Sequence, residues 1–365
     1  MNIISIDKPL AAFAQFNTDV IVTGCAPYGN GHINDTFLVN SRNIDGSPKR
    51  YILQAINTNV FKKPFEVMHN IEKVTSFLKT KTDDERRVMS LVKTRDGAAY
   101  YSDSDGRCWR LYDFIEDSLC LDLPETPEDF YQSAVAFGQF QNYLNEFPVS
   151  ELYETIPDFH NTPDRYKKFL LAVEADKVGR AKEVAEEIKF VKDRADFYSV
   201  LFDAEKAGKI PFRVTHNDTK INNVMLDLKT RTALCVIDLD TIMPGFSVND
   251  FGDSIRFGAS TAAEDEKDLD KVWMDLDLFE SYAKGFLKGC GGLLTDDEIM
   301  MLPEGAKMMT IECGMRFLTD YLEGDTYFKT KYPEHNLDRC HTQFKLVSDM
   351  EQKWDKMKEI VKKHI

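Results

Sequence analysis

The sequence predicts an α+β protein of two lobes, with a β-rich amino-terminal lobe and a larger, mostly helical carboxy-terminal lobe. Strand-like runs separated by glycine-bearing turns fill about the first 115 residues, whereas apolar residues at helical spacing dominate the remainder. A short β-rich stretch over residues 212–242 interrupts the helical part. We therefore expect the two lobes to span residues 1–115 and 116–365.

The elements of the amino-terminal lobe follow from alternation, turn residues and helical spacing. The first two strands enclose a loop that contains Gly29 and Gly31. A helix follows the third strand, because its apolar residues recur every three or four positions. The expected elements are a strand over 19–22, a strand over 36–39, a strand over 50–56, a helix over 65–79 and a strand over 108–115.

Helix starts in the carboxy-terminal lobe are marked by proline and by capping residues. Pro127 precedes two acidic residues, which the helix dipole favours in a first turn. Thr162 is the expected N-cap of a later helix, with Pro163 at the first helical position. The helical pattern continues over residues 181–201 and resumes after the β-rich stretch.

Composition indicates an ordinary globular chain. The 365 residues are 43% hydrophobic and 29% charged, which suits a folded protein with a sizeable core. The net charge of −15 argues against binding to nucleic acid or to anionic membranes, because both attract positive charge. No feature of the sequence indicates a protein partner.

Cysteine usage and hydropathy predict a soluble, cytoplasmic protein. The seven cysteines are scattered and form no C-x-x-C pair, as expected of buried thiols in a reducing compartment. The first eight residues lack the basic and apolar regions of a signal peptide. No run of about 18 apolar residues is present, so no membrane span is expected.

The most informative stretch of the chain is His216–Asn223, with the sequence HNDTKINN. Asp218 can accept the proton of an attacking hydroxyl, and Asn223 can hold Mg²⁺ through its amide oxygen. Asp238 follows the strand-like run 232–237 and is the second expected metal ligand. This order and spacing predicts a phosphoryl-transfer centre within a protein-kinase-like bilobal fold.

Each of these residues also has an ordinary structural explanation. Asp218 alone could end a strand or cap a helix, and Asn223 could bond its own backbone in a turn. We expect His216 to brace the catalytic loop rather than to transfer protons. His69, His160, His335 and His341 show no informative pattern.

The triplet Asp250-Phe251-Gly252 spells the metal-binding motif of protein kinases. We prefer Asp238 as the metal ligand because it directly follows a strand and lies nearer Asn223 in the sequence. Asp250 and Asp253 are expected to hold the catalytic loop or to cap the following helix. For Asp240 two roles stay possible, namely support of this loop or contact with the metal ion.

The glycine-bearing loop between the first two strands is the expected phosphate cover, because Gly29 and Gly31 would let backbone N–H groups approach the nucleotide. The third strand is unusual. A kinase normally places a lysine there, whereas this chain has Gln54, which carries no charge. Glu72 on the following helix is a weak candidate for the acidic partner. Bound metal ions would then supply more of the neutralising charge.

Two absences favour a small acceptor molecule over a protein substrate. Asn217 stands where protein kinases carry the arginine that contacts a phosphorylated activation loop. No Ala-Pro-Glu segment follows the metal-binding residues.

The chain resembles bacterial N-acetylhexosamine 1-kinases, members of the aminoglycoside-phosphotransferase-like group. The resemblance runs through nearly the whole chain, and Gln54 is shared by that family. It rests on residues Tyr28–Asn34, Arg50–Gln54, His216–Asn223, Ile237–Gly245, Asp250–Thr261, Glu312–Phe317 and Asp320–Asp325.

The resemblance implies ATP- and Mg²⁺-dependent phosphorylation of the anomeric hydroxyl of N-acetylglucosamine or N-acetylgalactosamine. Asp218 would be the base, and Asn223 with Asp238 the metal site. Arg316 and Tyr327 would contact the sugar, although Arg316 could equally pair with Asp320 one helical turn later.

The resemblance also implies the residues of the nucleotide site. His32 and Asn34 would lie at the mouth of the phosphate site. The segment Cys108–Glu116, with Tyr112 and Phe114, would form the hinge that holds adenine.

Two other functions stay open. The first is a kinase of another small hydroxyl compound, such as an aminoglycoside, choline or homoserine. Arg316 in the expected acceptor pocket disfavours such cationic acceptors. The second is a nucleotide-binding pseudokinase scaffold, which only Gln54 suggests.

Overall fold

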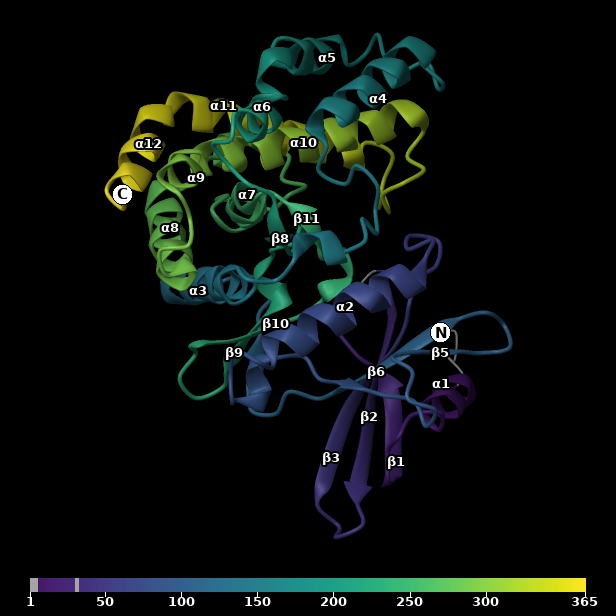
Figure 1. Ribbon diagram of the computed structural model, residues 1–365. Helices are drawn as coiled ribbons and strands as arrows, with labels where there is room; N and C mark the ends of the chain where they lie inside the picture. Colours follow the sequence, from purple (N-terminus) through teal and green to yellow (C-terminus); the bar gives the residue numbers. More distant parts are fainter. Residues whose placement is uncertain (1–5, 30–32) are drawn as a thin grey trace.

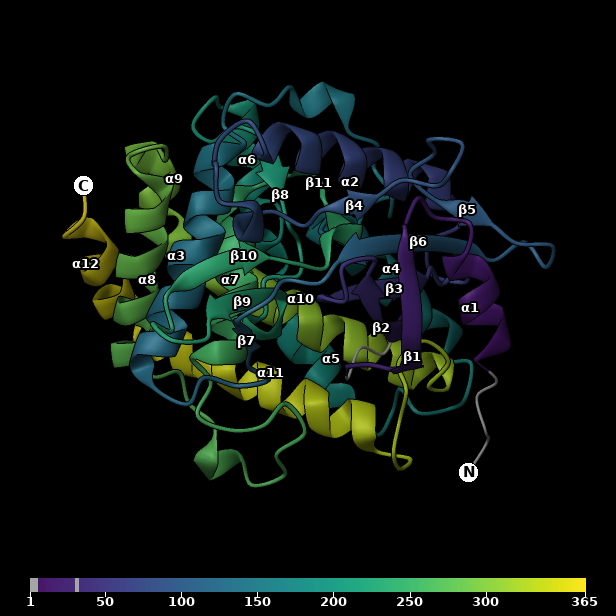
Figure 2. The ribbon, with the colours of Figure 1, turned by 90° about the horizontal axis from the view of Figure 1, so that it is seen from below.

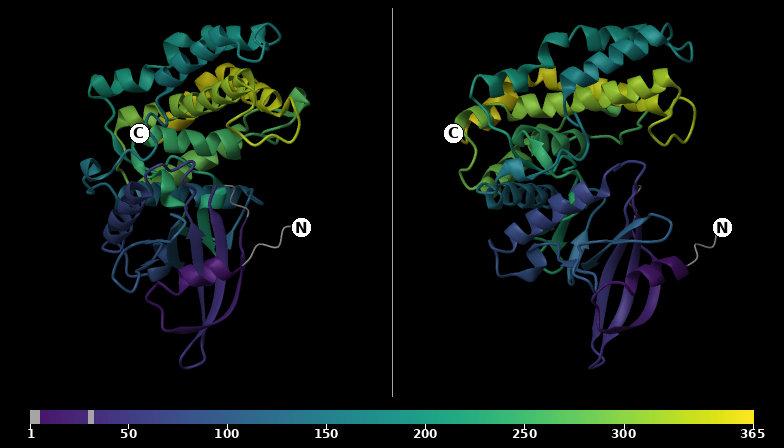
Figure 3. Two further views of the ribbon diagram at one scale, coloured as in Figure 1. Left: turned by 90° about the vertical axis from the view of Figure 1, so that its right-hand side faces the viewer. Right: turned by 45° about the vertical axis from the view of Figure 1, so that its right-hand side comes forward.

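The computed structural model confirms the predicted α+β class and its two lobes. It describes residues 6–29 and 33–365. Figure 1 shows a lobe built on an antiparallel sheet at the bottom and a lobe of packed helices at the top. Figure 3 shows the same division from two further directions.

The amino-terminal lobe is organised around one antiparallel sheet. Its strands are ordered β1-β2-β3-β6-β4, and β5 pairs separately with β6. The expected strands and helix of this lobe are therefore present. Their bounds are α1 Asp7–Phe13, β1 Val20–Pro27, β2 Asp35–Asn43, β3 Pro48–Ala55, α2 Pro64–Leu78, β4 Leu91–Val92, β5 Tyr101–Ser102 and β6 Cys108–Asp113.

The two faces of this sheet have different tasks because side chains alternate along each strand. Phe37 of β2, Leu53 of β3 and Trp109 of β6 pack with Phe13 of α1 in a small core. Their neighbours Thr36, Gln54 and Arg110 consequently lie on the opposite face, toward the helical lobe.

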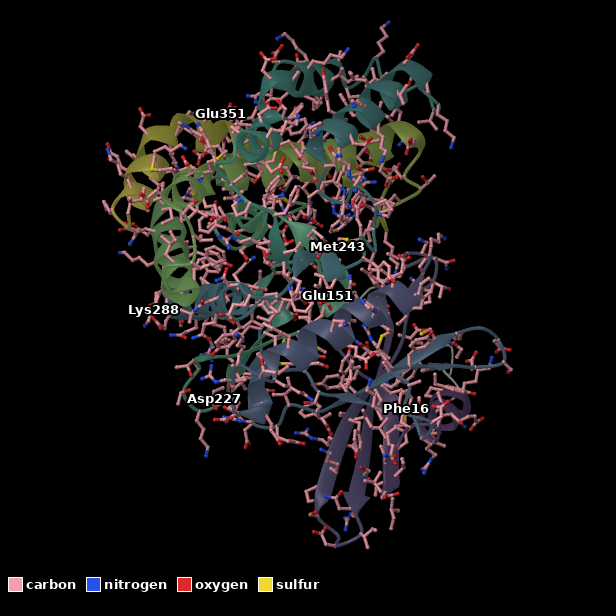
Figure 4. All side chains as sticks on the ribbon, viewed as in Figure 1. Phe16, Glu151, Asp227, Met243, Lys288 and Glu351 are labelled. Carbon is pink, nitrogen blue, oxygen red and sulfur yellow. The ribbon has the colours of Figure 1, made fainter. Side chains whose placement is uncertain are left out.

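Helix α2 joins the two lobes. The Nδ2 atom of Asn70 donates to the carbonyls of Tyr153, at 2.8 Å, and Ile242, at 2.9 Å. Lys73 pairs with Glu151 at 2.9 Å, and Figure 4 shows Glu151 where the two lobes meet. The chain leaves the large sheet after Asp113 and enters a smaller sheet at β7, and the lobe boundary after residue 115 stays a prediction.

The carboxy-terminal lobe combines helices with two small sheets. One sheet has the order β10-β9-β7 and the other pairs β11 with β8. Figure 2 shows α3 beside α8 on one flank of this lobe. The strands are β7 Ser118–Cys120, β8 Arg213–Thr215, β9 Val224–Asp227, β10 Ala233–Val236 and β11 Met243–Gly245. The helices are α3 Pro127–Tyr143, α4 Thr162–Ala175, α5 Ala185–Lys192, α6 Val200–Lys206, α7 Ser247–Gly258, α8 Leu276–Cys290, α9 Asp296–Met300, α10 Leu302–Glu323, α11 His335–Gln352 and α12 Trp354–Lys362.

Helices α7 and α10 approach each other unusually closely through two glycines. A Cβ atom on Gly252 would lie 2.2 Å from the carbonyl oxygen of Gly305. Since any larger side chain would force the backbones apart, this contact fixes α7 against the core. Within the described part of the chain, no helix has the length and apolar character needed to cross a membrane.

The expected N-cap at Thr162 is wrong by one residue. Asn161 caps α4, because its side chain accepts a hydrogen bond from the backbone N–H of Asp164 at 3.1 Å. The hydroxyl of Thr162 instead donates to the buried carboxylate of Glu312 at 2.5 Å. Both side chains can cap a helix, and the tertiary contact with Glu312 decided between them.

Candidate active site

The loop after β8 brings Asp218 and Asn223 together. The Nδ2 atom of Asn223 donates to the backbone carbonyl of Asp218, at 2.8 Å, and to its carboxylate, at 3.2 Å. Asp218 also pairs with Lys220 at 2.8 Å. Its side chain is 28% exposed, so the carboxylate is held on one side and open on the other.

The electrostatic surroundings keep Asp218 ionised. Burial opposes its charge, but the nearby cations Lys220 and Arg256 outweigh that effect, so the pKa of Asp218 is lowered. The sequence prediction did not include Lys220. A cation two residues after the expected base was the signal for it.

His216 connects this loop to the strand end that carries Asp238. The ring is fully buried, its Nε2 donates to the carbonyl of Ile237 at 2.9 Å, and its Nδ1 accepts from the N–H of Asp218 at 3.3 Å. This tautomer follows from the partners, because a carbonyl can only accept. The N–H of Ile237 donates to the carbonyl of Asn223 at 2.9 Å. His216 and Asn223 thus both bind the residue that precedes Asp238.

Asp238 has the backbone and charge expected of a functional carboxylate. Its φ of 59° lies in the left-handed region, which is costly for a residue other than glycine and is concentrated at functional sites. The residue is exposed. Surrounding protein and the negative charges of Asp240 and Asp218 raise its pKa to about 6.

Helix α7 holds the catalytic loop from behind through Asp250 and Asp253. The carboxylate of Asp250 accepts from the N–H groups of His216, at 2.9 Å, and Asn217, at 2.8 Å. Asp253 accepts from the N–H of Thr219 at 3.0 Å. Asp250 is 1% exposed and lies inside a helix, so the triplet it begins does not reach the open cleft.

The donor set fits a magnesium ion that arrives with a nucleotide. Because the amide nitrogen of Asn223 donates to Asp218, its oxygen is left to face a cation. Asp238 supplies a carboxylate, and Mg²⁺ in nucleotide sites usually takes one or two protein ligands besides phosphate and water. Within the described residues, no group of three or more His, Cys, Asp or Glu forms a protein-only metal cage.

Part of the expected nucleotide-binding wall lies within the residues that the structure describes. Gly29 has a φ of 78°, a conformation that favours glycine, while Gly31 and His32 lie outside the described residues. The rings of Tyr28 and Phe114 meet edge to face at 6.1 Å, so Phe114 lies beside the glycine-bearing loop.

Tyr112, the other expected hinge residue, lies in a different environment from Phe114. Its side chain is only 2% exposed and belongs to the core between the large sheet and α2. Of the two expected hinge side chains, only that of Phe114 is partly exposed.

A buried arginine lies next to Gln54. The Nε atom of Arg110 donates to Gln54 Oε1 at 3.0 Å, and its guanidinium pairs with Asp240. Asn34 also donates to Asp240, at 2.6 Å. Arg110 was not among the site residues predicted from the sequence. A charged residue inside the apolar strand β6 could have indicated a buried ion pair.

Glu72 does not take the place of the acidic partner. It forms an ion pair with Lys93 on the other side of α2, and both side chains are about two-fifths exposed. The acidic partner on the Gln54 side is Asp240, from the carboxy-terminal lobe.

A cavity of about 200 Å³ lies between α4, α10 and the loop after α10. Among the described residues no carboxylate lies within ion-pairing distance of Arg316. Its guanidinium instead lies 5.5–5.8 Å from three aromatic rings. The lining residues are Arg165, Lys168, Met315, Arg316, Thr319, Asp320, Glu323, Tyr327 and Phe328.

Asp320, which could have paired with Arg316, organises the loop that closes this cavity. Its carboxylate accepts from the backbone N–H groups of Thr326, Tyr327 and Phe328 at 2.7–3.0 Å. The negative charge is therefore already used by the loop, and Arg316 is left facing the cavity.

Two contacts link the cavity to the catalytic loop. Glu312, one turn before Arg316 in α10, accepts from His160 at 2.9 Å. The other ring nitrogen of His160 lies 3.2 Å from the carbonyl of Asn217. The wall of the cavity is thus connected to the residue that precedes Asp218.

The fold and this constellation define a phosphotransferase of the bilobal, protein-kinase-like class. Residues 24–274 match the model of the phosphotransferase enzyme family, APH, and the chain belongs to that family. The predicted membership of the aminoglycoside-phosphotransferase-like group is confirmed, and the narrower N-acetylhexosamine 1-kinase assignment stays a prediction.

Several solved structures share the fold. A microcompartment-associated aminopropanol kinase has a TM-score of 0.63 and 15% identity, covering 97% of this chain and 98% of that chain. An aminoglycoside phosphotransferase from Alicyclobacillus acidocaldarius also has a TM-score of 0.63, with 12% identity and coverage of 98% and 97%. An amicoumacin kinase solved with AMP-PNP and Ca²⁺ has a TM-score of 0.55 and 12% identity, covering 100% and 94%.

Proposed function

We propose that this protein transfers the γ-phosphoryl group of ATP to the anomeric hydroxyl of an N-acetylhexosamine, either N-acetylglucosamine or N-acetylgalactosamine. The products are the sugar 1-phosphate and ADP. The observation that carries the proposal is the catalytic loop, in which Asp218 is open on one side and tied to Asn223 on the other. Because the reaction consumes ATP, we expect it to occur in the cytoplasm.

Asp218 orients the acceptor and receives its proton. Its lowered pKa keeps it ionised at neutral pH, so it accepts a hydrogen bond from the hydroxyl. A carboxylate of this kind is a weak base, but an anomeric hydroxyl is more acidic than an ordinary alcohol. Positioning by Lys220 and Asn223 therefore contributes more than basicity.

Asn223 and Asp238 would hold Mg²⁺. When bound, the ion would neutralise negative charge on the phosphates. The amicoumacin kinase with AMP-PNP and Ca²⁺ supports a nucleotide and divalent cation in this fold. In this acidic chain, Lys220 adds local positive charge beside the reacting groups.

The cavity beside α10 supports a sugar as the acceptor. Arg316 has donors to offer to sugar oxygens, and Tyr327 and Phe328 provide aromatic surface. The combination of aromatic surface and a few convergent polar groups is typical of small-molecule sites. The choice of N-acetylhexosamine rests on the sequence motifs that resemble those of hexosamine 1-kinases.

A kinase of another small hydroxyl compound is the second candidate. The named activities of the aminopropanol, ethanolamine and amicoumacin kinases of the same fold favour it. Cationic acceptors are disfavoured, because three cations line the cavity against two carboxylates. The cations are Arg165, Lys168 and Arg316, and the carboxylates are Asp320 and Glu323. Repulsion between like charges would oppose their binding.

A panel assay distinguishes the candidates. The protein is incubated with Mg-ATP and N-acetylglucosamine, N-acetylgalactosamine, glucose, galactose, kanamycin, choline, ethanolamine or homoserine, and ADP release is measured. The proposal requires turnover on an N-acetylhexosamine, with the phosphate found on the anomeric oxygen by ³¹P NMR. Turnover only on an amino alcohol or an aminoglycoside would establish the second candidate, and nucleotide binding without turnover would indicate a scaffold.

Arg316→Met tests the acceptor cavity separately. A hydrogen bond to a charged group contributes about 1.5–3 kcal/mol, so the KM for the sugar should rise on the order of tenfold or more. The KM for ATP should stay unchanged, because the cavity lies apart from the nucleotide wall. A matched control is Lys284→Met, which removes an exposed cation of the same lobe that lies outside the cavity and pairs with Glu280 at 3.0 Å.

A further inference from the structure

Four side chains form a continuous row of hydrogen bonds from the amino-terminal sheet into the metal-binding loop. Thr36 faces Gln54 across β2 and β3, and Gln54 faces Arg110 across β3 and β6. The amide of Gln54 donates to Thr36 Oγ1 at 3.0 Å and accepts from Arg110 Nε at 3.0 Å. Arg110 continues the row through its ion pair with Asp240.

Burying the charge of Arg110 costs free energy, because the guanidinium loses its hydration. It is 1% exposed, and the side chain of Asp240 is 4% exposed. A buried ion pair adds little net stability compared with apolar residues of the same size, because both charges lose their hydration. An apolar pair would have served the fold as well, so the retained charge points to a role at the site.

We propose that Arg110 supplies the positive charge that the third strand lacks, and that Gln54 and Arg110 together replace the strand lysine of other kinases. Arg110 acts as a positioning residue. It balances the charge of Asp240, two residues after the metal ligand Asp238, and thereby fixes the metal-binding loop against the amino-terminal lobe. This inference rests on the nucleotide site of the proposed function and is independent of the acceptor.

The pairing explains why position 54 holds a neutral amide. A lysine at this position would bring an ammonium beside the guanidinium of Arg110, which lies 3.0 Å from the present amide oxygen. The two cations would repel each other and compete for Asp240. Glutamine avoids the conflict, because its oxygen accepts from Arg110 while its nitrogen donates to Thr36.

The row also connects the glycine-bearing loop to the metal site. Asn34, at the end of that loop, donates to Asp240 at 2.6 Å and accepts from the N–H of Asn57 at 2.9 Å. Asp240 therefore receives one donor from the loop and one from β6. Removing Arg110 would leave Asp240 with an uncompensated buried charge and would loosen both attachments.

The test compares nucleotide affinity and stability in four variants: Arg110→Met, Arg110→Lys, Gln54→Lys and the double variant Gln54→Lys/Arg110→Met. Calorimetric titration gives the Kd for Mg-ATP and for ATP without metal, and thermal unfolding gives Tm. Lys8→Met is the control, since it removes an exposed cation of the same lobe that pairs with Asp105.

Arg110→Met should weaken Mg-ATP binding about 10–100-fold, the usual cost of losing a residue that orients a metal ligand. Arg110→Lys should lie between this variant and the wild type, because an ammonium keeps the charge without the planar geometry. Gln54→Lys alone should also weaken binding. The double variant should bind Mg-ATP more tightly than either single variant, because the new lysine then meets Asp240 without a competing arginine.

Wild-type affinity for Mg-ATP in Arg110→Met, with only Tm lowered, would overturn the inference by reducing Arg110 to a structural residue. A double variant no better than Gln54→Lys alone would also overturn it, and this comparison holds even where Arg110→Met fails to fold. Failure of the wild-type protein to bind Mg-ATP would instead refute the proposed function itself.

Discussion

The loop of Asp218 and the cavity beside α10 are linked through His160, yet they are built in opposite ways. In the catalytic loop the backbone N–H groups of His216, Asn217 and Thr219 all find carboxylate acceptors on α7. In the cavity Arg316 lacks a carboxylate partner among the described residues, and the buried Nε atom of Arg165 has no hydrogen-bond partner. These backbone donors of the loop are all hydrogen-bonded within the protein, whereas the cavity contains side-chain donors that have no partner in the described part of the protein.

This difference separates chemistry from recognition. A saturated loop would fix the proposed base and metal ligands in one geometry before any ligand arrives, which is the requirement of preorganised catalysis. Donors without internal partners destabilise the free protein and gain their hydrogen bonds only with an acceptor molecule. We therefore expect substitutions in the loop to lower turnover, and substitutions in the cavity to change acceptor affinity and stability.

The largest effect is expected from Asp218→Asn. Turnover should fall on the order of 10²–10⁴-fold, the usual contribution of a general base, because the amide cannot receive the hydroxyl proton. The Kd for Mg-ATP should remain near that of the wild type, as measured by calorimetric titration. Asp193→Asn, an exposed carboxylate of the same lobe, is the control and should leave turnover unchanged. Wild-type-like turnover in Asp218→Asn would remove Asp218 from the mechanism.

Asp238→Asn should lower turnover and also weaken Mg-ATP binding, on the order of 10–100-fold. A metal ligand must be deprotonated, and the pKa of Asp238 is raised to about 6. The affinity of the wild type for Mg-ATP should therefore fall as the pH drops through about 6, and Asp238→Asn should lose this dependence. Titrations between pH 5 and 8 provide the measurement.

The same carboxylate should oppose folding when no metal is bound. Its pKa is raised above the unfolded value of about 3.9, so the folded protein holds the proton more tightly. The contribution of Asp238 to stability consequently declines as the pH rises from about 4 to 6. At pH 7 without Mg²⁺, Asp238→Asn should have a Tm equal to or above that of the wild type. A lower Tm would contradict this charge assignment.

Asp250→Asn tests whether the loop depends on its internal bonds. One oxygen becomes an amide that cannot accept, so the N–H of His216 or Asn217 loses its partner. The free energy of unfolding should fall by about 1–3 kcal/mol, and turnover should fall with it. Chemical denaturation with and without Mg-ATP is the measurement, and the loss should persist in both conditions. Unchanged stability would show that α7 is dispensable for the loop.

Arg165→Met should give the smallest effect, with the opposite sign. Burial, together with the charge of Arg316, lowers the pKa of Arg165, which means that its charge is disfavoured in the folded protein. Removing it should raise the stability of the free protein by about 1 kcal/mol, read as an increase in Tm. Added acceptor should then stabilise the variant less than the wild type. A lower Tm would show that the hydrogen bond from Arg165 to the carbonyl of Phe159, at 3.0 Å, outweighs the cost of burying the charge.

The contact between Asp218 and Asn223 follows from the local sequence, whereas their roles as base and metal ligand stay a prediction. His216–Asn223 places Asp218 and Asn223 five residues apart, and a short 3-10 turn at residues 221–223 brings them into contact. The strand before Asp238 was also predictable from the sequence, because its apolar run indicates a buried strand. Neither inference needed information from another part of the chain.

The remaining features depended on contacts between distant segments. In the sequence, Gln54 indicated that the positive charge of the third strand is missing. In the structure, Arg110 lies beside it although it is 56 positions later, because β3 and β6 pair in that register. Asp320 could have paired with Arg316, but the loop after α10 folds back onto its carboxylate first.

Periodicity, capping and short motifs fixed the α+β class, the strands around Gly29 and the loop of Asp218, because these depend on residues within a few positions of one another. Only the tertiary structure decided which cation pairs with Asp240 and which arginines face the cavity. A charge takes the partner that is nearest in space and least exposed to water, and sequence distance carries no information about either.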